Sequence, residues 1–168
     1  RSRGLGDVYK RQLPWGYSPT PQGALLAAIG GHVRLALAPD QQWPQVVRLV
    51  TAPGRGREEF IAFRSLQSVE GAIKEGKARR FVGFKVKNWV WDDDTKTPVS
   101  CAVVLAQKQG TTLLSYPVAM VWLGGDWRIM LPTTRDKIDA TPLTSLEGFV
   151  TLPQPSQKAV SYTHLRAH

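Results

Sequence analysis

The sequence lacks most of the residues from which catalytic and metal sites are built. It has a single cysteine, Cys101, so no disulfide can form within the chain. Of its three histidines, His164 and His168 lie at the very end and only His32 lies in the body of the chain. A zinc site or a base–nucleophile pair needs more such residues. We therefore expect no metal and no cofactor, and we expect His32 to be a packed structural residue.

Long apolar runs and nucleotide-binding motifs are also missing. No stretch approaches the ~20 apolar residues that span a bilayer. The first residues, RSRGLGDVYKRQ, lack the apolar core of an export signal. The glycine loops at 54–56 and 124–126 have neither the lysine of a P-loop nor GxGxxG spacing after a strand, so they are expected to be turns.

Both ends of the chain differ from the sequence between them. Residues 1–12 and residues 160–168 (VSYTHLRAH) have no periodic apolar pattern and resemble translated sequencing-adaptor sequence. We expect one domain over residues 13–150, an artefactual or disordered tail over 1–12, and a disordered tail over 151–168 whose part from 160 is artefactual. Part of the formal net charge of +9 belongs to these tails.

The first helix is predicted to begin near residue 20. Pro19 and Pro21 favour an extended lead-in, Ser18 or Thr20 can cap the helix, and a proline then stands at its first position. Its apolar stripe is expected at Leu25, Ala28, Ile29, Val33 and Ala36. The pair Gly30-Gly31 weakens this helix by about 2 kcal/mol relative to alanines. The expected benefit is a close approach of the helix to a sheet.

Two further helices are predicted before residue 80. Asp40 can cap a short one, whose apolar side holds Trp43, Val46, Val47 and Val50. A third is expected from Glu58 to Glu75, with a stripe formed by Ala62, Phe63, Leu66, Val69 and Ile73.

From Arg80 the apolar period becomes two, which is typical of strands. In the first strand, one face is expected to hold Val82, Phe84, Val86 and Val90, and the other Gly83, Lys85, Lys87 and Trp89. The second strand alternates around Val99, Cys101, Val103 and Leu105. Between them, the carboxylates at 92–94 lack the spacing of a calcium loop and are interpreted as a solvated turn.

A hairpin over residues 112–131 is the strongest local pattern. Gly124-Gly125 tolerates the positive φ angles of a two-residue turn, which would place Leu123 opposite Asp126. The same register pairs Trp122 with Trp127, Met120 with Ile129 and Val118 with Leu131, all on one apolar face. We expect this face to receive the first and third helices.

Three helices followed by four antiparallel strands predict an α+β fold, with N-terminal helices packed on a curved four-stranded antiparallel sheet. This order is similar to the cone-shaped, cystatin-like fold of ketosteroid isomerases and nuclear transport factor. Enzymes of that fold place an acid or base inside the cone. The strands here offer none, and an enzyme would need loop acids such as Asp126 or Asp136. We therefore expect no catalysis.

Two sets of side chains are candidates for binding. Aromatic residues could line an apolar pocket or simply form the core: Trp89, Trp91, Tyr116, Trp122 and Trp127. Basic residues could bind nucleic acid or an anionic envelope polymer: Lys74, Lys77, Arg79, Arg80, Lys85 and Lys87. A solvated helix end followed by a half-exposed strand explains the basic set better, and nucleic acid is the less favoured partner.

Four segments carry a family resemblance: TPQGALLAA (20–28), GFKVKNW (83–89), VWLGGDWRIMLP (121–132) and LTSLEGFV (143–150). With them, residues 14–150 resemble an uncharacterised family of actinobacterial proteins. Its members are typically exported or tethered by an N-terminal membrane segment and are often associated with conjugative elements. The resemblance implies an extracytoplasmic, membrane-tethered interaction or scaffold domain with protein partners in the cell envelope or a secretion complex. It supplies no catalytic residues. The alternatives are a cone that binds a small apolar ligand and a basic-patch binder.

Overall fold

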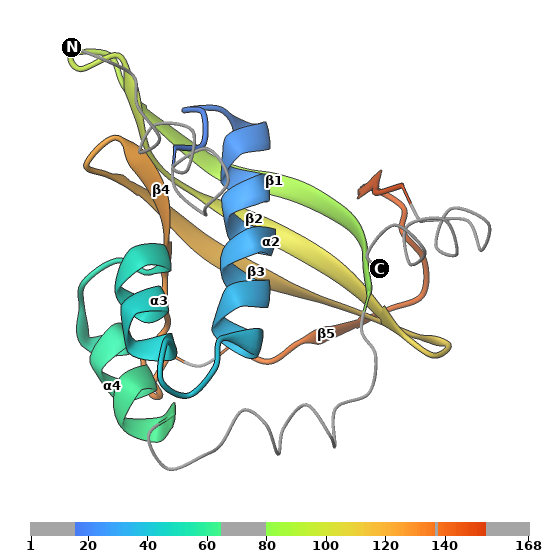
Figure 1. Ribbon diagram of the computed structural model, residues 1–168. Helices are drawn as coiled ribbons and strands as arrows, with labels where there is room; N and C mark the ends of the chain where they lie inside the picture. Colours follow the sequence, from blue (N-terminus) through green and yellow to red (C-terminus); the bar gives the residue numbers. More distant parts are fainter. Residues whose placement is uncertain (1–15, 65–79, 137, 154–168) are drawn as a thin grey trace, which may run out of the picture.

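The computed structural model describes residues 16–64, 80–136 and 138–153, which form three helices and one antiparallel sheet (Figure 1). The helices α2 (Pro21–Leu37), α3 (Trp43–Val50) and α4 (Arg55–Arg64) come first. The strands are β1 (Arg80–Asp92), β2 (Thr97–Gln109), β3 (Thr112–Leu123), β4 (Asp126–Met130), β5 (Thr141–Leu143) and β6 (Val150–Thr151). Their order is β4-β3-β2-β1-β6, with β5 paired to β3. The predicted α+β class is confirmed, and two short C-terminal strands raise the strand number from four to six.

Helix α2 crosses one face of the sheet and begins as predicted (Figure 1). The Thr20 hydroxyl accepts a hydrogen bond from the Gly23 amide (3.1 Å), and Pro21 follows in the first turn. The expected apolar stripe was partly wrong, because Val33 and Ala36 are exposed. The buried side consists mainly of small residues: Gly23, Ala24, Ala27, Ala28 and Gly31.

These small residues let the backbone of α2 come close to the sheet. A Cβ atom added at Gly31 would lie 2.8 Å from Cδ1 of Ile129 on β4. The helix continues through Gly30-Gly31, so the predicted close approach is confirmed. Between α2 and the sheet lies the main core, which includes Val103, Leu105, Met120, Trp127 and Ile129. Burial raises the pKa of Cys101, in the same core, to about 11, so its thiol stays protonated at neutral pH.

The entries of the other two helices differ from the prediction. Helix α3 has Gln42 at its N-cap without a side-chain cap, whereas Asp40 lies exposed in the preceding turn. Helix α4 begins at Arg55 rather than Glu58, because the carbonyl of Gly54 already accepts the first helical bond from the Glu58 amide (3.2 Å). The predicted continuation of this helix to residue 75 lies outside the described residues.

Strand β1 changes face part way along its length. Asn88 adopts a left-handed backbone (φ 56°), and the register with β2 shifts between Lys87 and Val90. As a result Trp89 packs against the core while Val90 is 47% exposed, the reverse of the alternation predicted from the sequence. A β-bulge of this kind inserts one residue and inverts every later position.

The β3–β4 hairpin has the predicted register, but the predicted pair of Val118 with Leu131 does not form because β4 ends at Met130. Leu123 pairs with Asp126, Trp122 with Trp127 and Met120 with Ile129, and both turn glycines have positive φ (59° and 81°). Among the described residues, the helices that pack on β4 are α2 and α3, so the described part of the third helix does not cover this face as expected. Helix α4 instead packs its Phe60 and Ile61 against Trp43 and Val47 of α3. The turn at 92–94 is confirmed, with Asp92 Oδ1 accepting from the amides of residues 94 (2.8 Å) and 95 (3.3 Å).

The outer side of β3 has a gap in its pairing. Strand β5 pairs with Leu113–Ser115 and β4 with Ala119–Leu123, which leaves Tyr116–Val118 between them. Leu123 and Asp126 flank a two-residue turn and so form a hydrogen-bonded pair, and every second residue back along β3 points its backbone to this side. Pro117 is one of these residues, and because proline has no N–H, no donor is lost there. Residues 131–133, Asp136 and Ile138 lie beside this gap.

Candidate functional site

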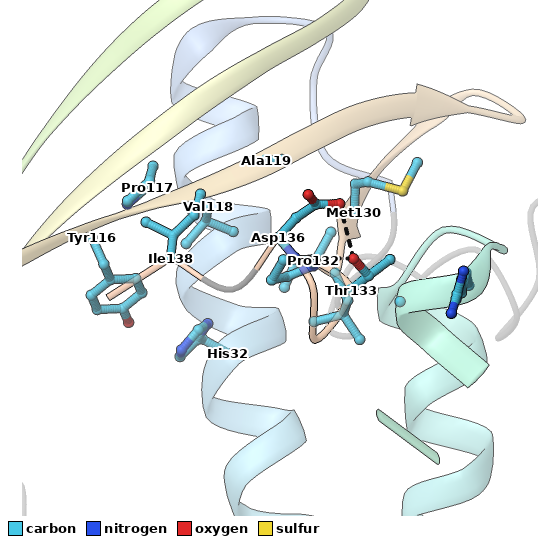
Figure 2. A pocket seen from close by; sticks show the side chains of 14 residues that line it. His32, Tyr116, Pro117, Val118, Ala119, Met130, Pro132, Thr133, Asp136 and Ile138 are labelled. Carbon is cyan, nitrogen blue, oxygen red and sulfur yellow. Dashed lines mark hydrogen bonds between the residues drawn. The ribbon is translucent and has the colours of Figure 1, made fainter. Parts of the chain in front are cut away.

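A pocket of about 480 Å³ lies at this gap in the sheet (Figure 2). Its walls come from β3 and β4, from His32 on α2, from the start of α4, and from residues after β4 that include Pro132 and Ile138. Most of the lining is apolar, and the pocket is partly open to solvent. Its volume is within the range of about 300–1,000 Å³ that is typical of sites for small molecules and cofactors.

His32 and Tyr116 form one end of the pocket. Their ring centroids are 5.3 Å apart, and His32 also makes an edge contact with Phe81 at 6.4 Å. The Tyr116 hydroxyl accepts a hydrogen bond from Nε2 of Gln107 (3.1 Å), which fixes the ring on β3. His32 is therefore packed against aromatic rings, as predicted, and in addition it lines the pocket.

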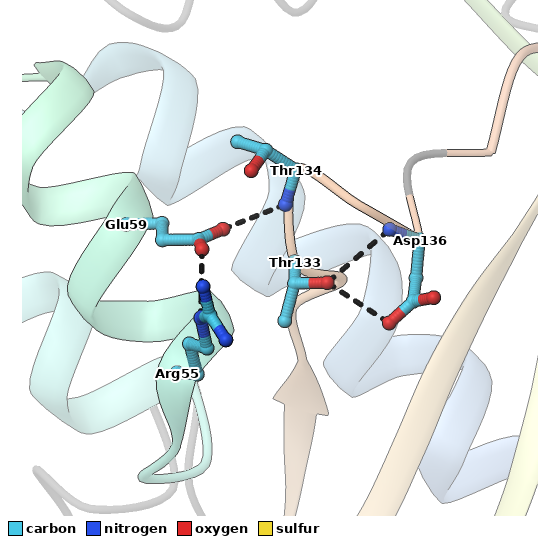
Figure 3. Close-up of polar contacts among 5 residues, drawn as sticks. All are labelled: Arg55, Glu59, Thr133, Thr134 and Asp136. Atoms are coloured by element: carbon cyan, nitrogen blue, oxygen red, sulfur yellow. Dashed lines mark hydrogen bonds and ion pairs between the residues drawn. The ribbon is translucent and has the colours of Figure 1, made fainter.

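Hydrogen bonds hold residues 133–136, the segment that covers the pocket (Figure 3). Glu59 of α4 accepts from the Thr134 amide (2.6 Å) through Oε2 and from Nε of Arg55 (3.0 Å) through Oε1. The bond from the Thr134 backbone, and then the contacts with Arg55, lower the pKa of Glu59. Farther along, the Thr133 hydroxyl donates to Oδ2 of Asp136 (2.9 Å) and accepts from its amide (3.2 Å). Together these bonds tie residues 133–136 to one another and to α4.

A second hollow, of about 300 Å³, lies on the other side of the same segment. It shares Gly56 and residues 131–133 with the pocket and is lined on its far side by Phe60 and Phe63 of α4. Exposed apolar side chains border the two hollows: Phe63 is 61% exposed, Ile138 58% and Met130 37%. Apolar surface is thus concentrated around residues 130–133 and Ile138.

The structure divides the predicted aromatic set. Trp89, Trp91, Trp122 and Trp127 form a continuous cluster, in which Trp127 lies 5.7 Å from Trp89 and 5.4 Å from Trp122 between ring centroids, and Trp91 stacks on Trp89 at 6.5 Å. Nε1 of Trp127 donates to the carbonyl of Ser18 (2.8 Å). Tyr116 lies apart from this cluster and lines the pocket. Pro132, Thr133 and Ile138 were not predicted to line a pocket, since they lie in an aperiodic stretch, and Leu131 was expected to pair with Val118 instead.

Asp126, one of the two loop acids considered for catalysis, has a structural function. It is buried, and its carboxylate accepts from the amides of Gly16 (2.6 Å), Tyr17 (3.1 Å) and Trp127 (2.9 Å). Three donors occupy the oxygens and fasten the lead-in of α2 to the β3–β4 hairpin. The other acid, Asp136, lines the pocket, where its side chain is bonded to Thr133.

Replacing Asp126 by alanine is therefore expected to destabilise the domain by about 2–3 kcal/mol, because hydrogen bonds to a buried charge are lost together. The free energy of unfolding from urea denaturation measures this. Asp126→Asn should recover part of the loss, since one carbonyl oxygen remains, and Asp136→Ala serves as the exposed control. An Asp126→Ala variant as stable as the Asp136→Ala variant would contradict the anchoring function.

The predicted basic set is only partly within the described residues. Arg80 and Lys87 are exposed on β1, whereas Nζ of Lys85 lies 4.5 Å above the centroid of the Phe149 ring. Lys74, Lys77 and Arg79 lie outside the described residues. In the parts of the chain that the structure describes, no three acidic, histidine or cysteine side chains gather as a metal site would need, and no helix has the length and apolarity to cross a membrane.

These features define an α+β domain with a pocket between its helices and the interrupted edge of its sheet. The chain belongs to the family described as a domain of unknown function (DUF8175), which matches residues 4–151. The match begins inside residues 1–12, whose foreign origin stays a prediction. Comparisons with curated proteins and with solved structures found no significant match.

Proposed function

We propose that this chain is a non-enzymatic interaction domain that takes an apolar group of a protein partner into the pocket lined by residues 131–133 and Ile138. The observation that carries the proposal is the pocket of about 480 Å³, mostly apolar and bordered by exposed Ile138 and Met130. Contiguous exposed apolar surface around a concave site is typical of binding sites. The polar groups at the pocket support binding rather than proton transfer, since Asp136 is bonded to Thr133 and Tyr116 to Gln107.

The cellular setting of this proposal rests on the family resemblance. We propose an extracytoplasmic domain, membrane-tethered in its full-length form, that serves as a scaffold in conjugative transfer or envelope assembly. A cystatin-like origin of the fold is part of the same proposal, and the helices-before-sheet order supports it.

A second candidate is a small apolar ligand that binds the same pocket without a protein. The cavity volume favours it, because it is large enough to enclose most of a small molecule. The predicted ligand site was the aromatic set, but of those five residues it is Tyr116 that lines this pocket.

A photo-crosslinking residue at position 138 distinguishes the two candidates. When this variant is incubated with an actinobacterial envelope extract, we expect it to crosslink to a protein. A variant with the photo-crosslinking residue at position 99 instead is expected to give no crosslink. Val99, on β2, is the control because it is another exposed apolar residue, 44% exposed against 58% for Ile138. Native mass spectrometry of the purified chain tests the small-ligand candidate, because a bound apolar molecule would increase the measured mass. A chain that crosslinks to no protein and carries no such molecule would refute both.

Ile138→Glu is expected to reduce partner recovery about tenfold or more, because a charge would have to be buried in an apolar site. The measurement is the amount of partner captured from the same extract. Val99→Glu should leave capture unchanged, and both variants should keep the circular dichroism spectrum of the parent chain. Equal loss in the two variants would show that capture depends on general apolar surface and would count against the pocket.

A further inference from the structure

The C-terminal end of α3 gathers three arginines, Arg48, Arg57 and Arg128, here called the arginine cluster. Nη2 of Arg57 donates to the carbonyl oxygen of Arg48 (3.2 Å), and Nη1 of Arg128 donates to the same oxygen (3.1 Å). Both nitrogens therefore lie within hydrogen-bond distance of a single oxygen atom. Guanidinium groups from α4 and β4 therefore meet over one carbonyl of α3.

Part of this arrangement is explained by the helix end. The last carbonyls of a helix have no partner within it and carry a partial negative charge. Arg128 Nη1 also donates to the Leu49 carbonyl (2.7 Å), while Arg57 donates to both the hydroxyl (2.9 Å) and the carbonyl oxygen of Thr51. These bonds close the end of α3 with two arginine side chains.

The partial negative charge at the end of α3 does not balance the positive charge of the three arginines. A helix terminus supplies about half an elementary charge, whereas the cluster brings three cations together. The ion pair between Arg55 and Glu59 does not involve the cluster, and within the described residues none of the cluster arginines is paired with a carboxylate. Burial, then Arg128 and Arg48, lower the pKa of Arg57, and Glu58 acts in the opposite direction.

Several N–H donors in the cluster also remain available. The hydrogen bonds to Arg48 and Thr51 use Nε and Nη2 of Arg57 and Nη1 of Arg128. Nη1 of Arg57, Nε and Nη2 of Arg128 and the exposed guanidinium of Arg48 have no partner among the described residues. A guanidinium offers its donors as a planar fork that matches two oxygens of an oxyanion.

We propose that the arginine cluster binds a phosphate group. A tetrahedral anion can accept from Arg57 and Arg128 together while Arg48 adds charge from the solvent side, and the planar donor forks of arginine match the oxygens of a phosphate group. The helix-end bonds hold Arg57 and Arg128 in place beforehand, so little side-chain entropy is lost on binding. The site is separate from the pocket and does not depend on its proposed function.

Titration of the intact chain with inorganic phosphate at low ionic strength tests this site. The Nε resonances of Arg57 and Arg128 are expected to shift and to saturate. Arg48→Gln should weaken binding about fivefold or more by removing a cation, and it leaves the hydrogen bonds of the cluster intact. Arg135→Gln, at an exposed arginine in the segment after β4, is the matched control and should bind like the parent chain.

Further ligands identify the source of the phosphate. Tighter binding of methyl phosphate than of dimethyl phosphate supports a free monoester, and the reverse supports a phosphodiester polymer. Shifts that do not saturate, equal weakening by Arg48→Gln and Arg135→Gln, or acetate binding as tightly as phosphate would overturn the proposal. In each of those cases the cluster would serve only to cap α3.

Discussion

Replacing Trp127 by alanine is expected to lower the free energy of unfolding by about 4 kcal/mol, as for large buried aromatic residues elsewhere. Trp127 is 1% exposed and packs between α2 and the indoles of Trp89 and Trp122. The substitution leaves a cavity and also removes the donor that binds the Ser18 carbonyl. Because that carbonyl belongs to the lead-in of α2, helix and sheet should loosen together. Urea denaturation followed by circular dichroism measures the loss.

Trp91→Ala is the matched control. It removes the same side chain from the same cluster, but Trp91 is 42% exposed, so the loss should be about 1 kcal/mol or less. Trp127→Phe should lie between the two, since it restores most of the apolar volume without the indole donor. If Trp127→Ala and Trp91→Ala were equally stable, Trp127 could not be the centre of the core.

The parts of the fold that could be predicted are those specified by neighbouring residues. The β3–β4 register follows from two glycines and the strand alternation around them, and the start of α2 follows from Thr20 and Pro21. Both are local signals whose geometry depends on few residues. The start of α4 was predicted three residues late, because its first bond uses a backbone carbonyl that has no side-chain signature.

The buried side of α2 shows why apolar periodicity alone was insufficient. Periodicity ranks residues by hydrophobicity and so favoured Val33, which is exposed. The packing instead selects small size, because a helix that lies close to a sheet has no room for branched side chains where the backbones approach. Gly31, directly above Ile129, is the clearest case. In β1 the same method failed because one left-handed residue, Asn88, inverted the faces beyond it.

The pocket could not be predicted from the sequence because long-range pairing creates it. It exists since β4 and β5 occupy different parts of β3 and leave Tyr116–Val118 between them. Strand β5 has three residues and no apolar period of its own. Pro117 was a local signal for an unpaired position on the outer side of β3, but it does not show which segment lies above it.

Gly56→Ala is expected to destabilise the domain by about 3 kcal/mol, at the upper end of the range for overpacking. An added Cβ would lie 2.0 Å from the carbonyl oxygen of Leu131, 2.7 Å from its carbon and 3.0 Å from the Pro132 oxygen. These are backbone atoms of the segment that follows β4, and they cannot turn aside as a flexible side chain can. Either α4 or residues 131–132 must move, and both line the pocket.

Gly30→Ala provides the comparison for this substitution. Gly30 is also helical, but the nearest atom to an added Cβ is the Tyr17 hydroxyl oxygen at 3.0 Å, at the far end of a half-buried side chain rather than in the backbone. The gain in helix propensity, up to about 1 kcal/mol, should then outweigh the contact. Amide exchange separates local from global effects: Gly56→Ala should speed exchange at Thr134, whose N–H binds Glu59, more than at the β2–β3 ladder. If exchange rose equally at both places, the clash would act on overall stability rather than on the segment that covers the pocket.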